Sequence, residues 1–109
     1  MNLFTIEYFN AKVLETIEEW PVDMVAHYGR LLESACEHGP NLKMPYSRAM
    51  GNGLFEFRIR GSSGQARALY CFCMGQRIIV LHAFRKKTRQ TADHDLALAR
   101  KRLKDITHG

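Results

Sequence analysis

The chain lacks the signatures of membrane-spanning, secreted and common cofactor-dependent proteins. None of its apolar runs approaches the roughly 20 residues that a membrane span needs. Residues 1–7 contain no positively charged region ahead of an apolar stretch, which predicts that no secretory signal is present. No Walker loop, G-x-S-x-G elbow, G-x-G-x-x-G fingerprint or H-E-x-x-H helix occurs. We therefore expect a cytoplasmic protein with no membrane contact, no metal and no small-molecule cofactor.

Cysteine is scarce, and its spacing excludes two further classes of protein, those with a C-x-x-C redox site and those with a cysteine zinc site. The chain has three cysteines, Cys36, Cys71 and Cys73. The closest pair forms C-x-C, whose side chains point to the same face of a strand and bridge only with strain. Neither a C-x-x-C redox motif nor a zinc-binding spacing is present. We interpret all three as small core residues in a reducing compartment.

Positive charge is abundant but unevenly distributed. The chain has 109 residues, a length that predicts one domain over 1–109, and its net charge is +5. Residues 1–40 hold two basic and seven acidic residues, net −5, whereas residues 41–109 hold fourteen basic and four acidic ones, net +10. This asymmetry favours a polyanion-binding face built by the second part of the chain, and an ordinary basic surface is the alternative.

The hydrophobic pattern predicts an α+β fold. Helices are predicted over 10–19, from Pro21 to the Gly39-Pro40 break and over 92–106, and strands over 4–9, 54–60, 66–73 and from 78 onward. Residues 78–81 are apolar on both faces, which indicates a central strand. Residues 40–53, with Pro45 and two glycines, are interpreted as a loop. The expected architecture is an antiparallel meander with helices packed on one face.

The basic residues of greatest interest lie on a hairpin and after the central strand. Arg58 and Arg67 are predicted to share a sheet face, because both point away from the aromatic core. A sheet face bearing several arginines is better explained by solvent or phosphate than by a core. Further candidate phosphate-binding residues on the hairpin and in the strand-end cluster are Arg60, Arg85 and Arg89.

This set of side chains suits the cleavage of RNA. Such cleavage needs no metal, because the neighbouring 2′-hydroxyl attacks the phosphate while the protein moves protons and stabilises negative charge. The candidate charge stabilisers are Arg58, Arg67 and Lys87. His82 and Lys86 are candidate proton-transfer groups, since histidine titrates near neutrality and clustered lysines have lowered pKa values. A partly buried core histidine is an equally good explanation of His82.

Three motifs in order resemble a known family. G-L-F-E-F-R at 53–58, A-R-A-L-Y at 66–70 and I-V-L-H-A-F-R-K-K-T at 79–88 resemble the phage-type, HigB-like branch of the RelE/ParE toxin superfamily. The resemblance covers about residues 40–106. It implies a RelE-like fold, with two N-terminal helices on a small antiparallel sheet and a C-terminal helix. By position, Arg58, Arg67 and Lys86 or Lys87 match the family's basic active-site residues.

The resemblance also implies an activity and its partners. It implies a toxin of a type II toxin–antitoxin system, an endoribonuclease that cuts mRNA on the ribosome and is neutralised by a cognate antitoxin. The basic face is expected to attract an acidic, partly disordered antitoxin segment. The alternatives are a ParE-like toxin that inhibits DNA gyrase and a non-catalytic nucleic-acid-binding relative. One departure is that some relatives carry a tyrosine near the start of the last helix, where this chain has Thr91-Ala92-Asp93.

Overall fold

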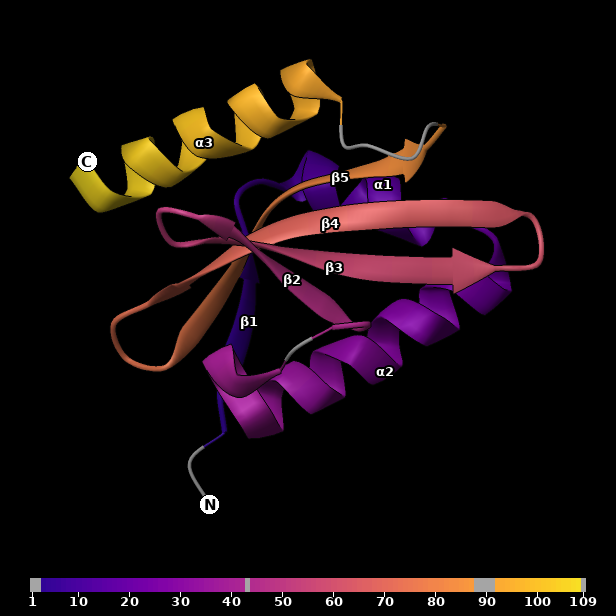
Figure 1. Cartoon of the computed structure of the whole chain (residues 1–109), viewed down its shortest axis with the longest axis horizontal. Coiled ribbons are helices and arrows are strands. Elements are labelled where there is room, and N and C mark those ends of the chain that lie inside the picture. Colours follow the sequence, from indigo (N-terminus) through magenta and orange to yellow (C-terminus); the bar gives the residue numbers. More distant parts are fainter. Residues whose placement is uncertain (1–2, 43, 88–91, 109) are drawn as a thin grey trace.

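The computed structural model describes residues 3–42, 44–87 and 92–108, and Figure 1 shows a twisted sheet between helices. The elements in chain order are β1 (Thr5–Tyr8), α1 (Ala11–Glu18), α2 (Val22–His38), the short 3-10 helix η1 (Gly39–Asn41), β2 (Ser47–Gly51), β3 (Leu54–Gly61), β4 (Gly64–Cys73), β5 (Arg77–Lys86) and α3 (Asp93–His108). In the described part of the chain, no helix is long and apolar enough to cross a membrane.

The sheet is mixed, with strand order β1-β5-β4-β3-β2. Strands β2 to β5 pair antiparallel, as the meander predicts, and β1 adds a parallel strand beside β5. The central position expected for residues 78–81 is confirmed, because β5 lies between β1 and β4. The interpretation of 40–53 as a loop missed β2. Its sequence, Ser47–Gly51, has no apolar alternation, so only pairing with β3 reveals it.

The helices cover both faces of the sheet, and the expectation that they pack on one face is wrong for α3. Helices α1 and α2 cover the face that carries Phe57, Tyr70 and Val80. Helix α3 lies across the sheet from α2 (Figure 1) and covers a second core that includes Leu69 and Leu81. The strands also present apolar side chains on this second face, and packing against α3 removes them from water.

Local signals in the sequence set the ends of the first two helices. The side-chain oxygen of Asn10 accepts a hydrogen bond from the backbone N–H of Val13 at 3.1 Å, which caps α1. Helix α2 ends at Gly39, which has φ +54, and a Cβ there would lie 2.8 Å from the Phe4 ring. Only glycine fits this position without strain and displacement of the ring.

A bulge in β5 decides which side chains reach the α3 face. Leu69 pairs with His82 and Tyr70 pairs with Val80, so Leu81 is one extra residue on β5. Directly opposite residues share a face, and one extra residue reverses the alternation that follows. His82, Phe84 and Lys86 therefore point to the α3 side. An unbroken alternation would have turned them toward α1 and α2.

Candidate functional site

Two arginines meet on the α3 side of the sheet. Arg58 of β3 lies directly opposite Arg67 of β4, so their side chains share a face, as predicted. Lys86 of β5 lies opposite Gln65, two residues from Arg67 on the same face. Partial burial lowers the pKa of Lys86, the charge of Arg67 lowers it further and Glu56 partly offsets this. The hairpin and the end of β5 therefore bring three of the predicted cations together.

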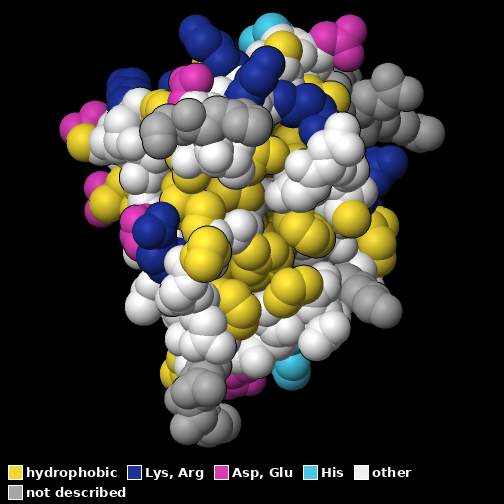
Figure 2. Space-filling view, turned by 90° about the vertical axis from the view of Figure 1, so that its left-hand side faces the viewer, with side chains coloured by type: hydrophobic (Ala, Val, Ile, Leu, Met, Phe, Trp, Pro, Cys, Tyr) yellow, Lys and Arg dark blue, Asp and Glu magenta, His cyan; other side chains and the backbone are white. Residues whose placement is uncertain are grey.

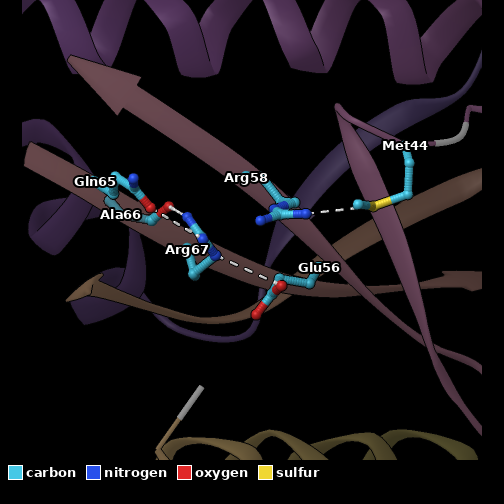
Figure 3. Close-up of polar contacts among 6 residues, drawn as sticks. All are labelled: Met44, Glu56, Arg58, Gln65, Ala66 and Arg67. Carbon is cyan, nitrogen blue, oxygen red and sulfur yellow. Dashed lines mark hydrogen bonds and ion pairs between the residues drawn. The ribbon is translucent and has the colours of Figure 1, made fainter. Parts of the chain in front are cut away.

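Arg67 is buried, with only 1 % of its surface exposed. Its Nη1 donates to the carbonyl of Ala66 at 3.0 Å, and its Nη2 donates to Oε1 of Gln65 at 3.2 Å (Figure 3). Its Nε lies 3.6 Å from Oε1 of Glu56, which is 2 % exposed. Burial lowers the pKa of Arg67, and the Glu56 carboxylate counteracts this. A guanidinium in this setting stays charged and needs its counter-ion.

Arg58 has spare hydrogen-bonding capacity. Its Nη1 contacts the sulfur of Met44 at 3.5 Å, a weak acceptor (Figure 3). Among the described residues, its buried Nε has no hydrogen-bond partner. A buried guanidinium donor without a partner is costly unless an anion or water satisfies it. Of the two arginines, Arg58 is the more open to a phosphate, because its side chain is only half-buried.

His82 is tied to α3. Its Nε2 lies 2.7 Å from Oδ1 of Asp95, and its ring stacks on Phe84 with centroids 5.4 Å apart. Asp95, in the first turn of α3, is 8 % exposed. The pair joins β5 to α3, which agrees with the structural alternative for this histidine. Its part in proton transfer stays a prediction.

The other predicted basic residues are more scattered. Lys87 directly follows β5 and is exposed. Arg60 is exposed near the end of β3, opposite Gln65. Arg85 points to the other side of the sheet, where it pairs with Ala66 and its Nη2 donates to the Ser63 carbonyl at 3.4 Å. Arg89 lies outside the described residues. The strand register thus places Arg58, Arg60, Arg67 and Lys86 on one face of the sheet, while Arg85 joins Lys86 and Lys87 only in lining a pocket at the end of β5.

Three structural residues escaped the sequence interpretation. Glu56 is the buried counter-ion of Arg67. Arg100 and Arg102 of α3 both bond backbone carbonyls of the sheet. Arg102 donates to the Leu81 carbonyl at 2.6 Å and Arg100 to the Met50 carbonyl at 2.7 Å. These carbonyls lie at the register shifts of β5 and β2, where the pattern of apolar residues shows no signal.

The architecture is a RelE-like fold. The structure is similar to a chain of the archaeal RelE–RelB complex from Pyrococcus horikoshii OT3, with a TM-score of 0.57 and 15 % identity, over 83 % of this chain and 100 % of that one. The family described as phage-derived protein Gp49-like (DUF891) matches residues 15–104. The chain therefore belongs to the Gp49-like family. None of the curated proteins is significantly similar to it in sequence.

Proposed function

We propose that this protein is the toxin of a type II toxin–antitoxin system, a metal-independent endoribonuclease that cuts mRNA on cytoplasmic ribosomes. The observation that carries this proposal is a basic face formed by Arg58 and Lys86 with the buried Arg67 beneath them, three cations on adjacent strands of one sheet. Like charges held this close are costly unless a polyanion or counter-ion offsets them. Among polyanions, the resemblance of the three sequence motifs to HigB-like toxins favours RNA.

The chemistry follows from the charge of these groups. The 2′-oxygen attacks phosphorus and loses its proton, while the 5′-oxygen leaves and gains one, giving a cyclic phosphate and a free 5′-hydroxyl. Lys86 is the proposed proton acceptor, because its lowered pKa increases the fraction of neutral amine. Arg58 and the exposed Lys87 stabilise the negative charge that develops on the phosphate.

Arg67 has a less direct part in this proposal. Its guanidinium is buried beneath the basic face, paired with Glu56 and bonded to the β4 backbone. From there it adds positive potential and lowers the pKa of Lys86. Direct contact with a phosphate would require Arg67 to exchange its present partners. We therefore assign first contact with RNA to Arg58, Lys86 and Lys87.

An acidic antitoxin is the proposed regulatory partner. Figure 2 shows hydrophobic side chains gathered at one end of the molecule, with Lys and Arg side chains above them. A pocket of about 260 Å³ between α3 and the β2–β3 turn is lined by Leu103, Arg100 and Lys104, among others. Apolar surface bordered by cations suits an amphipathic acidic segment that folds on binding. The similar archaeal RelE was itself crystallised in complex with RelB.

Cell-free translation tests the activity, with DNA supercoiling by gyrase measured in parallel. We expect the free protein to stop translation and to leave supercoiling unchanged. Lys86→Gln should relieve the block, while Lys12→Gln, an exposed change on α1, should not. Blocked supercoiling with normal translation would assign the protein to the gyrase-inhibiting toxins. Salt-dependent RNA binding without any block would indicate a non-catalytic relative.

A further inference from the structure

A pocket of about 250 Å³ lies where β5 ends and α3 begins. The residues that line it include the aromatic Phe84, the basic Arg85, Lys86 and Lys87, and the acidic Asp95. An aromatic ring beside ammonium groups is the combination that single-stranded nucleic-acid sites use for bases and backbone. The Asp95 carboxylate disfavours a phosphate inside the pocket, so the phosphate is expected at its cationic rim.

The Phe84 ring is held in place by its neighbours. One side of it stacks on the His82 ring, with an interplanar angle of 24°. His82 is in turn held by its contact with Asp95 at 2.7 Å. The bulge at Leu81 turns Phe84, together with His82 and Lys86, to the α3 side. A half-buried ring fixed in this way is a preorganised stacking platform, because little side-chain freedom remains to be lost on binding.

The pocket adjoins the basic face. Phe84 lies directly opposite Arg67 across β4 and β5, and opposite residues of an antiparallel pair are about 4.5–5.5 Å apart at Cα. Lys86 belongs to both, since it lines the pocket and its pKa responds to the charges of Arg67 and Arg58. In a nucleotide, one sugar separates the phosphate from the base. A phosphate at Lys86 therefore brings an adjacent base to Phe84.

We propose that this pocket takes up one unpaired nucleobase of the RNA, stacked on Phe84, next to the phosphate that Lys86 contacts. This inference rests on the proposed function, since it identifies how the same site holds its substrate. Stacking on an aromatic ring tolerates every base, because each base has a π-face. The role of Phe84 is thus to position the strand, and the cleavage chemistry stays with Lys86 and Arg58.

Binding of a short oligoribonucleotide with 2′-O-methyl groups, which cannot be cleaved, tests the pocket. Affinities are measured at low salt for this oligonucleotide and for a copy that carries abasic sites. Phe84→Leu should weaken binding of the base-bearing strand at least about fivefold and leave the abasic strand unchanged. Phe72→Leu, which removes a half-buried ring from the other face of the sheet, is the matched control.

Fluorescence gives a second reading that does not depend on removing the ring. Phe84→Trp retains an aromatic platform, and a stacked base should quench the indole introduced there, whereas inorganic phosphate should not. The native Trp20 is buried and provides a constant background. Absence of quenching in a variant that binds the base-bearing strand would overturn the proposal, as would equal binding of both strands by the unaltered protein.

The outcomes separate this inference from the proposed function. If the protein cuts ribosome-bound mRNA but Phe84→Leu binds and cuts as well as the parent, the proposed base pocket is wrong and the proposed nuclease activity is confirmed. If binding depends on the base and on Phe84 but ribosome-bound mRNA stays intact, the proposed base pocket is confirmed and the proposed nuclease activity is wrong.

Discussion

Arg58 and Arg67 face each other directly across β3 and β4, two guanidinium groups on adjacent strands of one sheet face. Opposed like charges destabilise a strand pair. Here the buried Glu56 carboxylate lies 3.6 Å from Arg67 and offsets part of that cost. The arrangement keeps Arg58 open toward the surface while Arg67 is held below it. An anion that binds at Arg58 would offset the remaining repulsion.

Arg58→Gln should reduce activity without destabilising the fold. The change removes one group that stabilises negative charge in the transition state, and such losses lower rates by about 10²–10³-fold. It also relieves repulsion with Arg67, so the free energy of unfolding should stay unchanged or rise slightly. Translation inhibition and urea denaturation measure the two effects. Full inhibition by Arg58→Gln would remove this residue from the site.

Glu56→Gln should destabilise the protein. It leaves the buried Arg67 without its counter-ion, and breaking one side of a buried ion pair costs about 3–5 kcal/mol. Urea denaturation of this variant is compared with that of Glu33→Gln, an exposed change on α2. The double change Glu56→Met with Arg67→Met should recover part of the loss. A double variant no more stable than Glu56→Gln would argue against the pair as the cause.

Arg102→Met should loosen α3. The Arg102 guanidinium bonds the carbonyl of the bulge residue Leu81 and lies 4.8 Å from the centre of the Phe9 ring. Losing a hydrogen bond from a charged donor costs about 1.5–3 kcal/mol of stability. The control is Lys101→Met at the adjacent, exposed position, which should change stability by less than about 0.5 kcal/mol. Thermal unfolding and amide exchange in α3 measure this. Equal stability of the two variants would mean that the bond is dispensable.

Activity should rise with pH through a lysine ionisation. In the proposed mechanism the neutral amine of Lys86 accepts the proton. Its pKa is lowered by burial and by Arg67, so the neutral fraction grows at a lower pH than for an ordinary lysine. The pH dependence of single-turnover cleavage measures this. Arg67→Lys keeps a positive charge near Lys86 and should largely preserve the profile, whereas Lys86→Arg should abolish the rise. A profile that Lys86→Arg leaves intact would assign proton transfer to another group.

Strand and helix periodicity predicted much of the fold because most elements bury one regular face. The alternation of Phe55, Phe57 and Ile59 marks β3, and Leu96, Ala99 and Leu103 recur at helical spacing along α3, where they pack in the second core. Periodicity could not locate β2, whose hydrogen bonds to β3 define it without an apolar pattern. Nor could it place α3, because the sequence does not show which sheet face a helix covers.

The candidate site was predictable only in part. Opposed positions in a hairpin follow from counting residues away from its turn, so Arg58 and Arg67 could be paired from the sequence. The sheet face on which Lys86 lies could not be predicted. The bulge at Leu81 was not recognised, and it reverses the face of every β5 residue that follows it. The burial of Arg67 with Glu56 also depends on tertiary packing, which leaves no local signal.

Primer extension on cellular mRNA after induction tests the central claim most directly. If the basic face on β3, β4 and β5 cuts RNA, the unaltered protein should produce new 5′ ends inside translated reading frames. Arg58→Gln and Lys86→Gln should produce none, while Lys12→Gln should cut as the parent does. Growth arrest with intact mRNA, or cuts that persist in both site variants, would contradict the account.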